Sequence, residues 1–178
     1  MTSIDSLSSQ SLKAVATFEL CPKKHIFKII FGPYSINLMV TQYPIQHARL
    51  IETSVENLWE ALTNPAIVKR YFFGTDLVTS WEVGSPIVFK GEWENQGYED
   101  KGTILAYEPR VKLAFSYLSN WSGKDDVPEN YLFVQYEVEA VGPHTRLTIT
   151  QTNYDEERAQ HSEQNWASVV DELIKVVA

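Results

Sequence analysis

The sequence predicts an α+β fold, in which two short helices follow the first strand and a long helix follows a run of antiparallel strands. Three observations predict it. An amphipathic helical pattern occupies residues 53–64, alternation with a period of two runs through much of residues 85–151, and an apolar stripe with helical spacing ends the chain. Strands and helices do not alternate along the sequence, so antiparallel pairing is expected.

The first strand is expected at residues 45–52, IQHARLIE, where alternating character and β-branched residues favour extended backbone. A helix follows, because Thr53 and Glu56 have the spacing of a capping box. Its apolar residues recur at helical spacing: Val55, Leu58, Trp59 and Leu62.

This helix is expected to end before Pro65, because the residue ahead of a proline disfavours the α region. Asn64 and Pro65 then serve as the cap and first position of a second short helix, AIVKRYFF. Gly74 ends it by adopting the left-handed conformation, and TDLVTSW leads toward the sheet.

The central part of the chain has the period of β-strands. In SPIVFKGEWEN, Ile87, Phe89, Gly91 and Trp93 share one face. Two further strands are expected at residues 98–109 and 111–118, followed by a polar loop at 119–130. A long hairpin that turns at Gly142 and Pro143 is expected at residues 131–153. The closing helix is expected after residues 153–165, with an apolar stripe that packs on the sheet: Trp166, Val169, Val170, Leu173, Ile174 and Val177.

Composition excludes several classes of function. The formal net charge is −8, with 23 acidic against 15 basic residues, which gives no electrostatic reason to bind nucleic acid or an anionic membrane. Cys21 is the single cysteine and the four histidines share no ligand spacing, so we expect no metal site, no cofactor and a reducing, cytoplasmic location.

Residues 1–38 differ from the rest and are expected to be an N-terminal extension. The run KKHIFKIIFGPYSINLMV resembles a signal peptide only weakly, because Lys28, Gly32 and Pro33 interrupt it and no small-residue cleavage site follows. The run is also too short to span a bilayer. We therefore predict a domain at residues 39–178 and hypothesise that translation begins at Met39.

Several motifs in this order resemble the START-like helix-grip (SRPBCC) superfamily, and within it the family homologous to the activator of heat shock protein 90 ATPase. The motifs are VENLWEALTNPAIVKRYF, WEVGSPIVF, DKGTILAYEPRVKLAFSY, YEVEAVGPHTRLTITQ and HSEQNWASVVDELI, which together span residues 45–178. The resemblance implies a curved antiparallel sheet that grips the C-terminal helix around a cavity, which in relatives holds hydrophobic or aromatic small molecules. Relatives often have paired glycines where this chain has Val83 and Gly84.

The strand periods and this resemblance together predict a ligand cavity lined by large side chains. Its expected wall consists of Phe89, Trp93, Phe115, Tyr117, Tyr136, Gln151 and Trp166. Phe73 and Trp81 are expected at its rim, where the second short helix joins the sheet. The alternative is that these rings only fill a core, because aromatic side chains bury large areas.

Three functions follow from these expectations. The leading prediction is a module that binds an apolar small molecule, with no catalytic residue, because the sequence carries no catalytic signature. The alternatives are a polyketide cyclase-like enzyme that uses cavity tyrosines and His161, and a co-chaperone-like protein that contacts a chaperone ATPase. The chaperone contact would use the polar sheet face, which is expected to hold Lys90, Glu92, Glu94, Gln135, Glu137 and Glu139.

Overall fold

The computed structural model describes residues 15–19, 26–31, 34–38 and 43–177, and the chain divides into two compact units, Met1–Gln42 and Tyr43–Ala178. The first unit contains an antiparallel sheet of three strands: β1 (Val15–Glu19), β2 (Ile26–Phe31) and β3 (Tyr34–Leu38). Sequence patterns had indicated only an extension here. Met39, at which the domain and translation were predicted to begin, lies outside the described residues.

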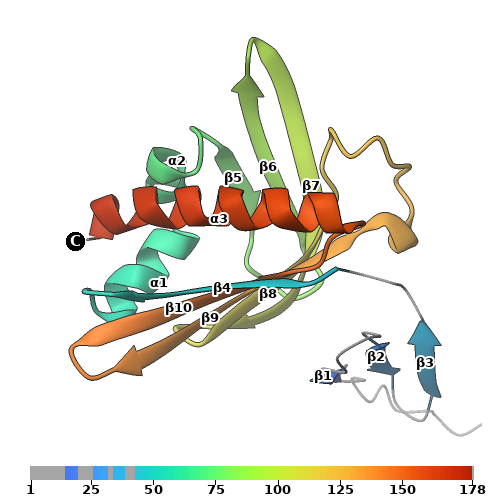
Figure 1. Cartoon of the computed structure of the whole chain (residues 1–178), viewed down its shortest axis with the longest axis horizontal. Coiled ribbons are helices and arrows are strands. Elements are labelled where there is room, and N and C mark those ends of the chain that lie inside the picture. Colours follow the sequence, from blue (N-terminus) through green and yellow to red (C-terminus); the bar gives the residue numbers. More distant parts are fainter. Residues whose placement is uncertain (1–14, 20–25, 32–33, 39–42, 178) are drawn as a thin grey trace, which may run out of the picture. The chain divides into compact units, whose positions relative to one another are not determined.

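The second unit is built on an antiparallel sheet of seven strands in the order β4-β10-β9-β8-β7-β6-β5 (Figure 1). The strands are β4 (Ile45–Ile51), β5 (Asp76–Thr79), β6 (Pro86–Trp93), β7 (Gln96–Glu108), β8 (Lys112–Tyr117), β9 (Leu132–Val141) and β10 (His144–Gln151). The predicted α+β helix-grip architecture is confirmed. β5 was expected only as a connection, because four residues are too few to display a period.

Two short helices follow β4, as predicted: α1 (Val55–Thr63) and α2 (Pro65–Tyr71). The predicted capping residue was wrong, because the Ser54 side chain, not that of Thr53, accepts the hydrogen bond from the Asn57 N–H. The Thr53 hydroxyl instead donates to the Val177 carbonyl oxygen, 3.1 Å away. This bond ties the start of α1 to the end of the last helix.

Asn64 joins the two short helices. Its backbone N–H donates to the Glu60 carbonyl at the end of α1, and its side-chain oxygen accepts from the Ala66 N–H in the first turn of α2. One residue therefore satisfies backbone groups that two helix ends would otherwise leave unpaired.

The last helix, α3 (Glu156–Val177), lies across the concave face of the sheet (Figure 1). It begins about three turns earlier than the apolar stripe predicted. The stripe did not reveal these first turns, because most of their side chains are exposed. Asp155 precedes the helix, and its carboxylate accepts a hydrogen bond from the Arg158 N–H. A short 3₁₀ turn, η1 (Pro128–Asn130), interrupts the loop between β8 and β9.

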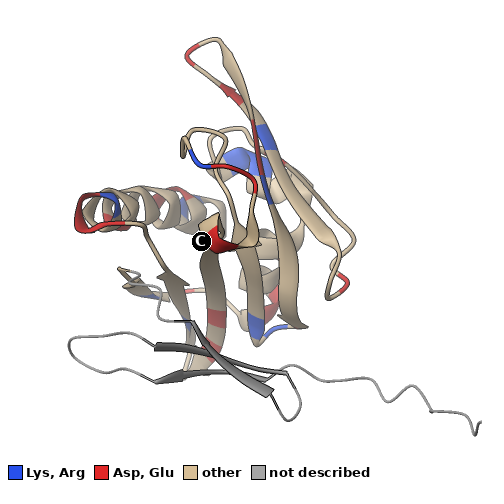
Figure 2. Ribbon diagram, turned by 90° about the vertical axis from the view of Figure 1, so that its right-hand side faces the viewer, with Lys and Arg blue, Asp and Glu red and all other residues tan. Residues whose placement is uncertain are grey.

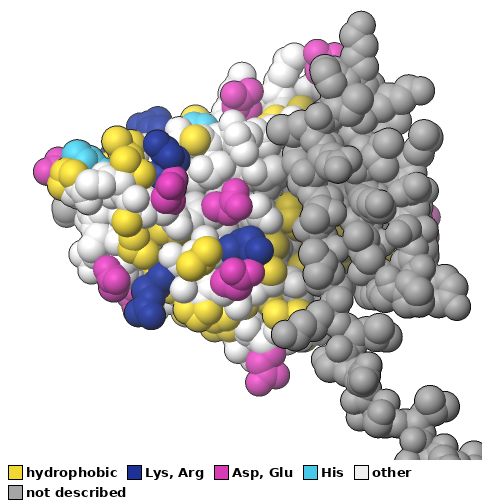
Figure 3. All heavy atoms as spheres, turned by 90° about the horizontal axis from the view of Figure 1, so that it is seen from below, with side chains coloured by type: hydrophobic (Ala, Val, Ile, Leu, Met, Phe, Trp, Pro, Cys, Tyr) yellow, Lys and Arg dark blue, Asp and Glu magenta, His cyan; other side chains and the backbone are white. Residues whose placement is uncertain are grey.

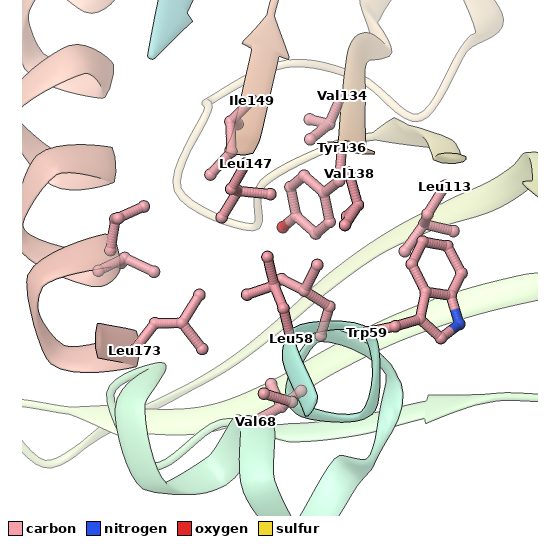
Figure 4. Close-up of a cluster of buried hydrophobic side chains, with 14 of the residues drawn as sticks. Leu58, Trp59, Val68, Leu113, Val134, Tyr136, Val138, Leu147, Ile149 and Leu173 are labelled. Carbon is pink, nitrogen blue, oxygen red and sulfur yellow. The ribbon is translucent and has the colours of Figure 1, made fainter. Parts of the chain in front are cut away.

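The core fills the space between the concave face of the sheet and the helices α1 and α3 (Figure 4). Its fully buried side chains include Leu58, Leu113, Leu147, Ile149 and Leu173. Burial of each such side chain stabilises the fold by about 1.5–3 kcal/mol. The interior therefore packs as the alternation along the strands predicted.

Charged residues of both signs are spread along the elements of the second unit, with acidic residues at the tip of the β6–β7 hairpin (Figure 2). On the face seen in Figure 3, hydrophobic side chains lie in small groups between charged ones of both signs. Lys90 pairs with Glu99, and Arg146 pairs with Glu139. The polar strand faces are therefore partly neutralised and do not form a uniformly acidic surface.

Candidate functional site

A small cavity lies inside the second unit, bounded by α1, α2, β5 and the concave face of the sheet. Its lining is made of apolar and aromatic residues: Leu62, Val68, Tyr71, Phe72, Leu77, Trp81, Ile87, Phe89, Leu113, Phe115 and Tyr136. Its volume is about 10 Å³, about enough for a single water molecule. Apolar and aromatic side chains therefore fill most of the space between these elements.

Phe72 lies at the centre of the ring network beside this cavity. It follows the last residue of α2, and its half-buried ring lies 6.0 Å from Phe89 and 5.9 Å from Trp166, centroid to centroid. It also contacts the neighbouring rings of Tyr71 and Phe73. Phe72 therefore connects α2, β6 and α3 across one side of the interior.

Four of the nine residues predicted for the ligand cavity line it: Trp81, Phe89, Phe115 and Tyr136. Trp81 stacks on Tyr107 with ring centroids 5.4 Å apart. Phe115 lies between Phe89 and Tyr136, at centroid distances of 5.6 and 5.8 Å. Strands β6, β8 and β9 therefore place neighbouring rings on one wall, as their alternation predicted.

Tyr136 supplies a polar atom to this wall. The residue is 7% exposed, and burial raises its pKa well above the ordinary tyrosine value, so the phenol stays neutral. Figure 4 shows its ring pointing from β9 into the space near Leu58 and Leu147. No hydrogen bond joins its hydroxyl to another residue in the described part of the chain.

Gln151 and Trp166 are buried next to this wall but do not line the cavity. The Trp166 ring N–H donates to Gln151 Oε1 over 2.8 Å, and the Gln151 amide donates to Asn153 and Ser162. These polar groups are hydrogen-bonded to one another, so the network holds α3 on the end of β10. Trp166 still contacts the Phe72 and Tyr136 rings through its faces and edges.

Tyr117 lies beside Phe89, outside the cavity lining, and its hydroxyl is hydrogen-bonded. The hydroxyl donates to Asp100 Oδ2 over 2.5 Å, while Asp100 Oδ1 accepts a hydrogen bond from the Asn120 N–H. Burial, followed by the nearby Asp100 carboxylate, raises the pKa of Tyr117 well above its ordinary value. This pair holds the beginning of the β8–β9 loop on the concave side of β7.

Phe73 and Trp93 lie outside the cavity lining. They are 52% and 53% exposed, and their rings meet edge to face with centroids 6.0 Å apart. Trp93 continues the inward face of β6, but it is the last residue of that strand, at the tip of the β6–β7 hairpin, which projects past α3 (Figure 1). Strand period alone does not reveal where the covering helix ends.

The lining residues that the sequence did not single out come mainly from α2 and β5. Tyr71, Phe72 and Leu77 are the main ones. Hydrophobicity was visible at these positions, but the end of α2 decides which of the successive rings Phe72 and Phe73 turns inward. Within the described residues, no group of three or more His, Cys, Asp or Glu side chains could hold a metal ion.

Comparison with known proteins identifies the family. The profile of the family described as "Activator of Hsp90 ATPase homolog 1-like protein" matches residues 52–178. The chain belongs to this family. A search of curated proteins finds no match. Among the described residues, no helix is long and apolar enough to cross a membrane.

Solved structures share the fold of this member of the Hsp90 ATPase activator homologue family. ChR145 from Cytophaga hutchinsonii is 42% identical, with a TM-score of 0.66 and coverage of 75% of this chain and 92% of that chain. CalU16 from Micromonospora echinospora is 18% identical, with a TM-score of 0.60 and coverage of 95% and 87%. The Aha1 dimer from Colwellia psychrerythraea is 20% identical, with a TM-score of 0.60 and coverage of 76% and 96%. The last two likenesses concern the fold alone.

Proposed function

We propose that this domain binds an uncharged, mostly aromatic small molecule between the sheet and its helices. The observation that carries the proposal is the cavity lining, which combines apolar and aromatic side chains with the neutral hydroxyl of Tyr136. Ligand sites are typically apolar with a few polar groups that fix orientation. A charged ligand is disfavoured because the lining contains no charged residue.

Binding requires some rings to move, since a cavity of about 10 Å³ holds no aromatic ring. The side chains best placed to move are Phe72 and Trp81. Both line the cavity and are only partly buried. Tyr136 and Phe115 are buried on central strands and would form the fixed wall. A cytoplasmic location remains part of this proposal.

The test is an NMR titration of the full chain with 2-naphthol and with naphthalene. We expect both compounds to shift amide resonances of β5, β6 and β9, and 2-naphthol to bind more tightly. Tyr136→Phe keeps the ring and removes the hydroxyl. It should weaken 2-naphthol binding by about 2–12-fold, the value of a net hydrogen bond of 0.5–1.5 kcal/mol, and leave naphthalene binding unchanged.

Tyr131→Phe is the matched control, because the Tyr131 hydroxyl donates to Asp126 on the surface. It should change neither affinity. Shifts confined to exposed rings such as Trp93 and Trp121, or no binding of either compound, would contradict the proposal and favour the interpretation of the interior as a filled core.

The second candidate function is contact with a chaperone ATPase, which the family description favours. The exposed acidic residues Glu92 and Glu94, at the end of the β6–β7 hairpin, offer a negatively charged contact for a basic partner. The test is binding to a purified Hsp90-type ATPase by calorimetry, with Glu92→Gln/Glu94→Gln against Glu52→Gln as the control, because Glu52 is exposed just after β4 and outside that sheet face. Binding that the hairpin variant leaves unchanged would exclude this surface.

The cyclase-like alternative has less support from the geometry. Of the two tyrosines predicted for the cavity, Tyr136 lines it, whereas the Tyr117 hydroxyl is bonded to Asp100 outside the lining. His161 is exposed on α3 and is not a lining residue.

A further inference from the structure

One side of the cavity is closed by a thin segment, residues 73–81, which we call the β5 flap. It runs from Phe73 through β5 to Trp81 and contributes Leu77 and Trp81 to the cavity lining. The flap lies between α2 and β6, whose residues line the cavity on either side of it. If the flap moved outward, the cavity would therefore open between α2 and β6.

Backbone strain marks both ends of the flap. Phe73 has a φ of 51° and Trp81 has a φ of 64°, so two bulky residues adopt the left-handed conformation that favours glycine. Gly74, with a φ of 74°, extends this conformation next to Phe73. Such backbone is typically found at functional sites and persists only while the surrounding structure holds it. Release of the flap would relieve strain at both of its ends.

Unlike β6, β8 and β9, the other strands that line the cavity, the flap strand β5 pairs on one side only in the described sheet. β5 has four residues and is an edge strand of the described sheet, paired with β6 alone. Its other attachments include the exposed Lys69–Asp76 ion pair, at 2.7 Å, and the hydrogen bond between the hydroxyls of Thr75 and Tyr98, at 2.6 Å. Leu77 is buried, and Trp81 stacks on Tyr107 with ring centroids 5.4 Å apart. Exposed ion pairs contribute little to stability. Local opening is favoured where few buried contacts must break.

We infer that the β5 flap is the entrance of the cavity, and that it swings away from β6 about Phe73 and Trp81 to admit the ligand. The inference rests on the proposed function for its ligand, whereas the opening itself is a property of the chain. These two parts are tested separately.

The first experiment measures opening without any ligand, by hydrogen exchange of backbone amides in the full chain. Val78 and Val88 are directly opposite on β5 and β6 with side chains on the outer face, so Val78→Cys/Val88→Cys in a Cys21→Ser background provides a disulfide lock. Glu139→Cys/Arg146→Cys, opposite on β9 and β10, is the matched control lock. The reduced flap variant should exchange its hydrogen-bonded β5 amides at least tenfold faster than those of β8 and β9.

Oxidation of the flap lock should slow β5 exchange at least tenfold, and oxidation of the control lock should leave it unchanged. Exchange of β5 at the rate of β8 and β9 in the reduced protein would overturn the inference, because β5 would then open only by global unfolding. This outcome does not depend on whether any ligand binds.

The second experiment measures how fast 2-naphthol associates, by stopped-flow tryptophan fluorescence. Oxidation of the flap lock should slow association at least tenfold, and reduction should restore the original rate. An unchanged association rate in the oxidised flap variant would overturn the inference that the flap is the entrance of the cavity. If 2-naphthol binds none of the variants while β5 exchange responds to the lock, the opening of the flap is supported and the proposed ligand binding is contradicted.

Discussion

Replacement of Phe72 by alanine tests whether this ring closes the interior. Truncation of a buried phenylalanine costs about 3–5 kcal/mol. Phe72 is half-buried, but its ring contacts four others, including Phe89 at 6.0 Å and Trp166 at 5.9 Å. We therefore expect a loss near the lower end of that range, about 3 kcal/mol. Phe73→Ala is the control. Among the described residues, the half-exposed Phe73 ring meets the aromatic rings of Phe72 and Trp93, and its loss should cost about 1 kcal/mol.

The assay is urea unfolding at constant pH, in which the slope with denaturant should stay constant while the midpoint falls. A second readout is binding of naphthalene, because the vacated space adjoins the cavity and an apolar cavity binds apolar compounds. The Phe72 variant should therefore gain affinity for naphthalene, and saturating naphthalene should restore part of its lost stability. Equal stability losses for the two variants, with no gain in naphthalene affinity, would refute the role of Phe72 as the closing ring.

Three further predictions concern the fold. Gly102→Ala should destabilise the fold by several kcal/mol or prevent folding, because an added Cβ would lie 1.6 Å from the Ser116 backbone oxygen. The control is Gly97→Ala, where the atom nearest to the added Cβ lies 3.9 Å away. The control variant should fold normally, as measured by circular dichroism. Asn64→Ala should cost about 1 kcal/mol in urea unfolding through loss of the α2 cap, and an unchanged midpoint would show that the cap is dispensable. Burial raises the pKa of Tyr136 in the folded state above its value in the unfolded chain. The contribution of the neutral phenol to folding stability is therefore intact below the ordinary tyrosine pKa of about 10 and is lost at higher pH. Stability should therefore fall above pH ~10, less so in Tyr136→Phe, when alkaline unfolding is followed by tyrosinate absorbance.

Much of the fold could be predicted because local patterns and tertiary packing agree. The alternation in β6, β8 and β9 correctly predicted which of their residues face the helices, and Asn64–Pro65 correctly marked the junction of α1 and α2. Predictions differed from the structure where local signals compete or are short. Ser54 and Thr53 are both suitable caps, and only the approach of the α3 end decides that Thr53 turns toward Val177.

The candidate site was predictable only in part. The strand period placed Phe89, Phe115 and Tyr136 on one face, and burial in the structure agrees with it. The period could not place Trp93, because its exposure depends on how far the hairpin projects past α3. Nor could it identify Phe72, whose inward direction depends on the backbone at the end of α2.

By itself, the sequence determined the class of fold, the order of its main elements and the aromatic character of its interior, because helix and strand periods are local properties of the chain. The tertiary structure alone decided that these rings leave room for about one water molecule, and that Phe73 and Trp81 are held in left-handed backbone. The physical reason is that cavity size and strain arise from elements distant in sequence, which meet only when α2, β5 and α3 pack on the sheet.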